Sequence, residues 1–386
     1  MKRTPGYLLQ NIAGTDYLLP YGQLIADHMR GVEINETGRR VWELLERELS
    51  RDQLHREYLK HVASGGPPES ELIRDLDQFL DLLIARGLIE GDAPDRPQTQ
   101  EPCAYIGIAG LTLSFCGPRE LIDESFLKDF CVEPRSHVDQ RVCVLWGKPM
   151  FRTNGKILVR GSELVVCERE RDYLLLFPTF SRIWEVSLSK DGADVTLYCK
   201  SPVNEELTYQ FFHALRLAFL YLAQKRGMWA IHSASLLYRD KAWLFSAPAG
   251  TGKSTHVELW RELYHTPAIN GDLNLLALEG GRPVIHGLPW CGTSEIFDRR
   301  TLPLGGIVLL KRAERDRVEE LSDQRKALLT MQRFISPMWT PAQLDAGAVF
   351  AQHLAGLIPV CLLRCTKAPA AAETMKEWID QNSPEV

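Results

Sequence analysis

The stretch that most constrains the fold is Lys241–Thr255, which reads KAWLFSAPAGTGKST. Its first six residues, Lys241–Ser246, contain four apolar residues in a row and are followed at once by a segment rich in Ala, Pro and Gly. A run that short, ended by Pro and Gly, favours a strand over a helix. We therefore predict a buried parallel strand that leads directly into a glycine-containing loop.

The loop after this strand has the spacing of a phosphate-binding loop. Ala247–Ser254 match the pattern G-x-x-x-x-G-K-[ST] everywhere except at the first position, where Ala247 replaces glycine. Gly250 and Gly252 let backbone N–H groups turn toward a phosphate, where side chains would collide. Lys253 supplies a positive charge for the β and γ oxygens. If the first position requires a positive φ, Ala247 costs about 1 kcal/mol, and otherwise nothing is lost.

The residues after the loop complete the pattern. Ser254 carries a hydroxyl that can ligate Mg²⁺, and the helix predicted from Lys253 to Tyr264 directs its positive end at the bound anion. The sequence therefore predicts a site for a nucleoside triphosphate, taken as ATP with Mg²⁺. The residues expected to contact it are Pro248, Ala249, Gly250, Thr251, Gly252, Lys253, Ser254 and Thr255.

Composition sets limits on the partners. The 386 residues are 45% hydrophobic and 25% charged, which is ordinary for a globular protein of two or three domains. A net charge of −5 argues against a broad surface for nucleic acid or anionic membrane. No apolar run approaches the ~20 residues of a membrane span, and the amino terminus lacks the apolar core of a secretory signal. The nine cysteines include no C-x-x-C pair, so we expect thiols in a reducing cytoplasm.

The amino-terminal unit, residues 1–92, is predicted to be a winged-helix domain. A hairpin is expected across Ala13–Thr15, and three helices are expected to follow it. Asn35 is placed to cap the first helix, and Gly87 to end the third. The segments INETGRRVWELL and FLDLLIARGLI resemble the PqqD-type fold, which holds the leader peptides of ribosomally made, post-translationally modified peptides.

This resemblance implies a precursor peptide as partner. In that family the leader adds to the sheet as an extra strand and lies against the third helix, so backbone groups supply affinity. A winged helix that reads DNA is the structural rival. It would need a basic recognition helix, yet Glu69–Leu83 carries five acidic residues against Arg74 alone, so DNA binding is not expected.

The rest of the chain is predicted to be one catalytic domain. Residues 93–102 are rich in proline and charge and are interpreted as a linker. Residues 103–230 alternate short apolar runs with turn signals and are expected to form mainly antiparallel strands and a helix. Residues 231–386 are expected to form the phosphate-loop core. The fold class is thus α/β, with a domain of residues 103–386 after the winged helix.

Three separate segments join the phosphate loop in a recognisable order. His232-Ser233-Ala234 precedes it, Asn270-Gly271-Asp272 follows it, and His286-Gly287-Leu288-Pro289-Trp290-Cys291-Gly292 comes next. This order resembles the HPr kinase/phosphorylase family, which shares its nucleotide fold with ATP-dependent phosphoenolpyruvate carboxykinase. The resemblance implies that His232, Lys253 and Asp272 are catalytic. It also implies that Asp272 and Ser254 hold Mg²⁺.

One position departs from that family. Gly271 stands where the first of two aspartates usually lies, so a single carboxylate, Asp272, remains as base, as Mg²⁺ ligand or as both. His286 and Trp290 fit either a functional or a packing role, Gly287 and Gly292 suit a tight turn, and Arg299-Arg300 is interpreted as a solvated pair.

The combined interpretation is a cytoplasmic kinase that phosphorylates a Ser or Thr hydroxyl of a precursor peptide bound through its leader. Two other classes stay open: an ATP-binding peptide chaperone without transfer activity, and an HPr-kinase-like enzyme acting on a protein or a small molecule. The sequence leaves the oligomeric state open.

Overall fold

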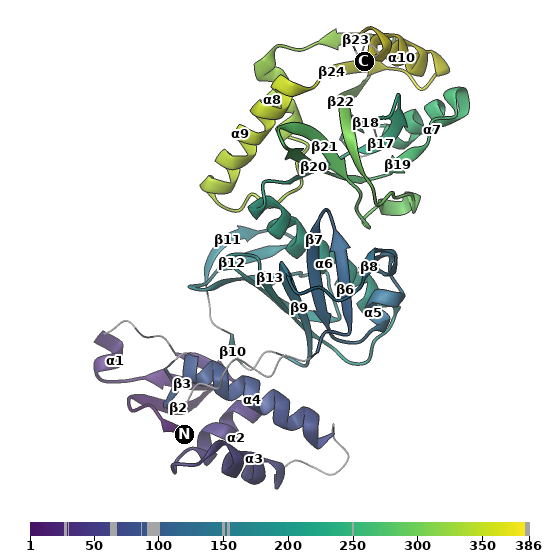
Figure 1. The fold of residues 1–386 in the computed structure, drawn as a ribbon. Helices are drawn as coiled ribbons and strands as arrows, with labels where there is room; N and C mark the ends of the chain where they lie inside the picture. Colours follow the sequence, from purple (N-terminus) through teal and green to yellow (C-terminus); the bar gives the residue numbers. More distant parts are fainter. Residues whose placement is uncertain are drawn as a thin grey trace. The chain divides into compact units, whose positions relative to one another are not determined.

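The computed structural model describes residues 1–26, 29, 31–61, 68–85, 87–90, 101–148, 151–152, 155–248 and 251–382. The chain is mixed α/β, as predicted, and it divides into two compact units (Figure 1). The first unit comprises Met1–Glu101 and Gly147–Lys156, and the second comprises Pro102–Trp146 and Ile157–Val386. The sequence analysis placed Gly147–Lys156 in the second domain, and no pattern in the sequence indicates that this segment belongs to the first unit. Most of the predicted linker, residues 93–102, lies outside the described ranges and stays a prediction.

The first unit contains a small sheet in the order β10-β4-β3-β2. β2 (Tyr7–Ile12) and β3 (Thr15–Pro20) form the predicted hairpin. Its turn is made by Ala13 and Gly14, both with positive φ, as two-residue hairpin turns prefer. The sequence analysis missed the third strand, β4 (Val32–Ile34), because three residues are too few to show an alternating pattern.

Gly147–Lys156 contributes a strand to this sheet. β10 (Phe151–Arg152) pairs antiparallel with β4, so that Phe151 lies opposite Ile34 and Arg152 opposite Glu33. On its other side β4 pairs with β3. The β4 edge of the first unit therefore already holds an extended segment of the chain.

The three predicted helices of the first unit are α2 (Glu36–Leu44), α3 (Arg51–Leu59) and α4 (Glu69–Ala85), and a four-residue helix that was not predicted, α1 (Gln23–Ala26), precedes them. Asn35 caps α2, since its Oδ1 accepts a hydrogen bond from the Gly38 N–H at 2.8 Å. Gly87, with φ +67°, follows α4. The remaining elements, β1 (Lys2–Arg3) and β5 (Ile89–Glu90), pair with each other. The core of this unit includes Leu18, Val41, Trp42, Leu54, Phe79, Leu80 and Leu83.

The second unit contains two large sheets. The first has the order β11-β12-β13-β14-β15-β9-β7-β6-β8, and the long helix α6 (Glu205–Lys225) packs against β14. Its other elements are β6 (Ala104–Ile108), β7 (Leu111–Cys116), α5 (Glu120–Asp123), η1 (Phe126–Phe130), β8 (Cys131–Val132), β9 (Gln140–Trp146), β11 (Lys156–Arg160), β12 (Val165–Glu168), β13 (Asp172–Leu176), β14 (Ile183–Ser189) and β15 (Asp194–Cys199).

Most of the described strand pairs of this sheet are antiparallel, and β9 is the exception. β12 to β15 form an antiparallel series, but β9 runs parallel to both β15 and β7. Parallel neighbours need long connections rather than hairpin turns, so no local signal in the sequence marks them.

The second sheet carries the predicted phosphate loop. Its order is β16-β20-β21-β22-β18-β17-β19, with β24 beside β22 and β23 beside β24. Its elements are β16 (Trp229–His232), β17 (Ala234–Tyr238), β18 (Lys241–Ser246), α7 (Lys253–Tyr264), β19 (Ala268–Asn270), β20 (Leu273–Glu279), β21 (Arg282–His286), η2 (Gly292–Ser294), β22 (Thr301–Arg312), β23 (Arg317–Glu320), α8 (Asp323–Met331), α9 (Pro341–Leu357), β24 (Val360–Cys365) and α10 (Pro369–Asn382).

The strand that leads to the loop, β18, is buried on both faces. Ala242 and Leu244 pack in a core with Phe350 and Leu354 of α9. Trp243 and Phe245 point to the opposite face, into a core with residues of α7 and α10. Figure 1 shows α8 and α9 on one side of this sheet and α7 and α10 on the other. Burial on both faces explains why the strand is continuously apolar, and β18 runs parallel to β22 as expected.

Two glycines make room for Trp243. A Cβ on Gly305 would lie 2.7 Å from the Trp243 ring, and one on Gly306 would lie 2.5 Å from it. Both glycines belong to β22, the strand next to β18. The indole therefore lies against bare backbone, and this fixes the position of β18 against its neighbour.

Two further observations concern membrane spans and cysteines. None of the described helices is long and apolar enough to cross a membrane. All nine cysteines are free thiols, of which Cys103 is exposed.

Candidate functional site

The phosphate loop joins β18 to α7. The helix begins at Lys253, as predicted, and Gly252 precedes it with φ +114°, a conformation that favours glycine. Ala247 is buried and does not adopt a positive φ, so its departure from the glycine pattern costs nothing. Ala249 and Gly250, two of the predicted contact residues, lie outside the described residues.

Lys253 is held over this loop. Its side chain is buried, and its ammonium group donates to the Ala247 carbonyl oxygen at 3.3 Å. Burial lowers the pKa of Lys253, and the charge of Asp272 opposes that shift. Ser254 and Thr255 follow in the first turn of α7, where both are exposed.

His232 and Asp272 meet beside the loop. The distance between His232 Nε2 and Asp272 Oδ1 is 3.3 Å. His232 ends β16, next to the phosphate-loop segment, because the Ser246 hydroxyl donates to the His232 carbonyl at 2.6 Å. Burial, followed by the charge of Lys253, lowers the pKa of His232, so the imidazole is largely neutral at pH 7.

The turn that carries Asp272 is fixed by its neighbours. Asn270 Oδ1 accepts hydrogen bonds from the N–H groups of Asp272 at 2.9 Å and Leu273 at 3.0 Å. The Asn270 amide donates to the Leu288 carbonyl at 3.2 Å, and Ser233 N–H donates to the Asp272 carbonyl at 3.0 Å. The carboxylate is thus attached to a preorganised turn, which is what a catalytic or metal-binding group requires.

Packing explains why no second aspartate precedes Asp272. A Cβ on Gly271 would lie 2.0 Å from Ser294 Oγ, and that hydroxyl donates to the Cys291 carbonyl at 2.7 Å. Gly292, with φ +64°, also approaches closely, because a Cβ there would lie 2.8 Å from Asp272 Cβ. The segment around η2 therefore fills the space that a side chain at position 271 would need.

The remaining sequence candidates lie in the framework. His286 is buried and contacts Thr301 Oγ1 at 2.9 Å. Trp290 is buried, donates from Nε1 to the Phe212 carbonyl at 3.0 Å and packs against Phe219. Arg299 donates to the Asp129 carbonyl, and Arg300 pairs with Asp298. The structure gives these residues packing and pairing contacts.

Three cationic or titratable residues near Asp272 had no signal in the sequence. Burial lowers the pKa of Arg216 on α6, and the negative charge of Asp272 partly opposes this shift. Burial also lowers the pKa of His213, to about 4, and the negative charge of Asp272 again opposes this shift. Arg333, which follows α8, lowers the pKa of both His232 and Lys253 by its charge. Asp272 therefore interacts with two cations, Arg216 and Lys253, whose positive charge suits a polyphosphate.

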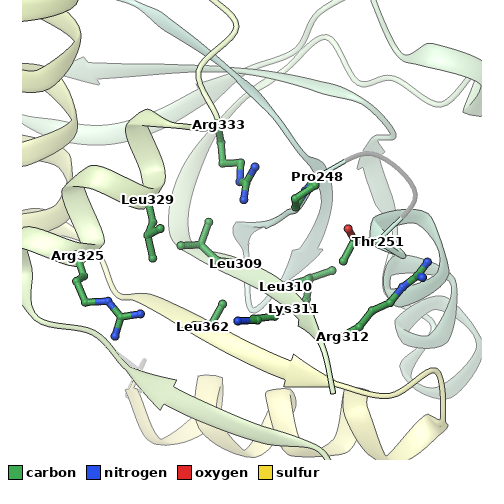
Figure 2. Close-up of a pocket in the computed structure, with 10 residues that line it drawn as sticks. All are labelled: Pro248, Thr251, Leu309, Leu310, Lys311, Arg312, Arg325, Leu329, Arg333 and Leu362. Carbon is green, nitrogen blue, oxygen red and sulfur yellow. The ribbon is translucent and has the colours of Figure 1, made fainter. Parts of the chain in front are cut away.

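A cavity of about 530 Å³ opens beside the loop (Figure 2). Pro248 and Thr251 of the phosphate loop form one side, and Arg325 and Leu329 of α8 form another. The carboxyl-terminal part of β22 and Leu362 of β24 complete the lining.

The protein offers few candidate ligands for Mg²⁺ at this site. Among the described residues, no group of three or more His, Cys, Asp or Glu side chains could hold a metal ion. Mg²⁺ commonly binds through one or two carboxylates, with substrate phosphates and water completing its shell. Asp272, whose side chain is 35% exposed, could provide such a carboxylate, with the Ser254 hydroxyl as a second candidate ligand.

Comparison with known proteins supports the assignment of the first unit. Residues 24–89 match the family model for coenzyme PQQ synthesis protein D (PqqD), so a PqqD domain occupies this part of the chain. No curated protein matches the sequence. The solved structure of the Hpr(Ser) kinase/phosphatase from Coxiella burnetii matches 39% of this chain and 93% of that one, at 10% identity and a TM-score of 0.24. A likeness that weak adds nothing to the assignment of the second unit.

We predict that Gly271→Ala destabilises the protein by about 1–3 kcal/mol, because the new methyl group collides with Ser294. Ser294→Gly in the same chain should recover most of that loss. Denaturant unfolding of the two single variants and the double variant measures the coupling. Gly356→Ala is the matched control, since a Cβ there meets nothing within 4 Å. A Gly271→Ala protein as stable as the wild type would contradict the packing described here.

Proposed function

We propose that this chain is an ATP-dependent kinase that phosphorylates a Ser or Thr hydroxyl of a ribosomally made precursor peptide. The observation that carries the proposal is the convergence of His232, Lys253 and Asp272 at a loop with phosphate-binding spacing. The PqqD domain supports the choice of a precursor peptide as substrate, because that family implies a bound leader peptide.

In the transfer step, the acceptor oxygen forms a bond to the γ-phosphorus while the bond from that phosphorus to the bridging oxygen breaks. The hydroxyl proton passes to the Asp272 carboxylate, and ADP leaves. Neutral His232, 3.3 Å from that carboxylate, orients it. Lys253 and the N-terminus of α7 bind the phosphate chain. Positioning and charge neutralisation provide most of the rate in such reactions, so one carboxylate suffices.

Bound Mg²⁺ would neutralise charge on the β and γ oxygens, and Asp272 and Ser254 are the residues that would hold it. Two arginines add positive charge near the transfer residues, since Arg216 interacts with Asp272 and Arg333 with His232.

Leader binding is proposed at the β4 edge of the first unit. Backbone groups along a sheet edge pair with an added strand, and alternate side-chain pockets provide selectivity. The antiparallel pairing of β10 with β4 supports this choice of edge. A leader that adds there replaces β10. Once bound, it raises the concentration of the core peptide near the transfer site, to about the millimolar range with a short linker.

A second candidate function is an ATP-binding peptide chaperone without transfer. The glycine at position 271 favours it, because the usual carboxylate pair is reduced to one and the space for another is filled. A kinase acting on a protein or a small molecule is the third. Phosphorylation of a peptide would distinguish the kinase from the chaperone. Dependence of that phosphorylation on the leader would distinguish the peptide kinase from a kinase for a protein or a small molecule.

Asp272→Asn should slow single-turnover phosphoryl transfer by about 10²–10⁴-fold, because the amide keeps the shape of the side chain but accepts no proton. The affinity of the same variant for MgATP, measured by calorimetry, should change far less. Glu295→Gln, which removes an exposed carboxylate from the nearby η2 segment, is the control and should transfer at the wild-type rate. A rate for Asp272→Asn within a few-fold of wild type would exclude Asp272 as the base.

Replacing both Phe151 and Arg152 by proline should tighten leader binding by about 5- to 50-fold, because proline cannot donate to the β4 ladder and the internal competitor is lost. The measurement is fluorescence anisotropy of a labelled leader, taken from a short peptide encoded by a neighbouring gene, with the full chain. The double alanine variant keeps the backbone donors and should bind as the wild type does. Equal affinity for the proline and alanine variants would move the leader to another surface.

A further inference from the structure

Trp290 joins α6 to the turn that carries Asp272. Its indole Nε1 donates to the carbonyl of Phe212 on α6 at 3.0 Å. Its own carbonyl accepts from the Asn270 amide at 3.5 Å, and Asn270 Oδ1 in turn accepts from the Asp272 N–H at 2.9 Å. This chain of hydrogen bonds holds the middle of α6 in a fixed relation to the candidate base.

One face of α6 presents three side chains that suit recognition of a peptide. Tyr209, His213 and Arg216 follow the i, i+4, i+7 spacing of a single helix face. The Tyr209 side chain is 61% exposed, and its ring centroid lies 4.3 Å from that of His213. Tyrosine and arginine are the residues that most often anchor protein interfaces, and an exposed tyrosine supported by a neighbouring ring is available for such a contact.

Arg216 is a half-buried cation that lacks a hydrogen-bonded partner. Among the described residues, none makes a hydrogen bond or an ion pair with its guanidinium group, and Asp272 is the carboxylate whose charge acts on it. Burial lowers the pKa of His213 to about 4, so this imidazole is neutral at pH 7 and Arg216 supplies the positive charge of the face. A half-buried charge with unfilled hydrogen bonds is costly, so Arg216 is arranged for an anion that a ligand provides.

This α6 face does not contribute to the cavity beside the phosphate loop. Among the described residues that line this cavity, none belongs to α6. Lys253 and the N-terminus of α7 are proposed to bind the phosphate chain, whereas Arg216 reaches Asp272 from α6. The base must contact the hydroxyl from which it takes the proton. A residue that reaches the base from outside the phosphate site is therefore placed for the acceptor rather than for the nucleotide.

We propose that Tyr209 and Arg216 bind the acceptor segment of the peptide, with Arg216 on an acidic side chain next to the phosphorylated Ser or Thr. The inference rests on the proposed function and adds the chemistry by which the acceptor is chosen. Arg216 donates to the carboxylate, and Tyr209 packs against an apolar or aromatic side chain. The two residues lie about 10 Å apart along α6, a distance that an extended peptide spans with about three residues. The acidic and the apolar residue of the substrate are therefore about three positions apart.

The test is steady-state phosphorylation of the precursor peptide from a neighbouring gene by the full chain. Arg216→Gln should lower kcat/KM for the peptide by about 10- to 100-fold, as expected for hydrogen bonds between charged groups, with an unchanged KM for MgATP. Arg216→Lys, which keeps the charge, should recover part of the loss. Tyr209→Ala should lower kcat/KM by about 3- to 10-fold, and Tyr209→Phe, which keeps the ring, should act as the wild type does. Arg226→Gln removes an exposed arginine just after α6, paired with Asp139, and is the control for loss of charge.

A change in the peptide tests the same contact from the other side. Replacing the acidic residue beside the acceptor by its amide should lower kcat/KM for the wild type as much as Arg216→Gln does, and should have little further effect on that variant. A merely structural role of Arg216 would not produce this coupling. Losses that multiply independently, or an acceptor without an acidic neighbour, would overturn the inference.

Two other outcomes separate this inference from the proposed function. If Arg216→Gln raises the KM for MgATP as much as it lowers kcat/KM for the peptide, the anion is a phosphate of the nucleotide. The inference is then overturned and the kinase assignment stands. If the wild-type chain binds MgATP but transfers nothing to the precursor, the proposed function itself fails, and the inference fails with it.

Discussion

Burial of β18 on both faces is the constraint on which the candidate site depends. Ala242 and Leu244 anchor the strand to one core, and Trp243 and Phe245 anchor it to the other. The glycines at 305 and 306 let the Trp243 indole lie against β22. A strand fixed in this way delivers its last residue, Ser246, to a fixed point, and Ser246 in turn holds the His232 carbonyl. The histidine and the start of α7 are therefore positioned by packing rather than by the ligand.

The same rigidity explains the unusual balance of charge around the loop. The turn at Asn270–Asp272 packs so closely against Ser294 that a side chain at position 271 has no room. One carboxylate thus interacts electrostatically with Lys253 and Arg216, while Arg333 interacts with the carboxylate's partner His232. A polyphosphate would supply the missing negative charge.

Local patterns in the sequence were sufficient for the elements that carry their own signals. The apolar run of β18, the glycine before α7, the Asn35 cap and the hairpin at Ala13–Gly14 all lie where predicted. Other features depend on residues far apart in the chain. The contact of Ser294 with Gly271, the approach of Arg333 to His232 and the pairing of β10 with β4 become visible only in three dimensions. The parallel strands around β9 are of the same kind, since no turn connects them.

The central claim is that ATP bound at this loop transfers a phosphoryl group to a leader-bound peptide. The most direct measurement is intact-mass spectrometry of a precursor peptide from a neighbouring gene, incubated with the full chain and MgATP, beside the same peptide without its leader. The account predicts the mass of one added phosphoryl group on the full precursor and little or none on the leaderless core. An unchanged mass for both peptides, with MgATP bound, would contradict transfer. Equal phosphorylation of both would contradict recognition through the leader.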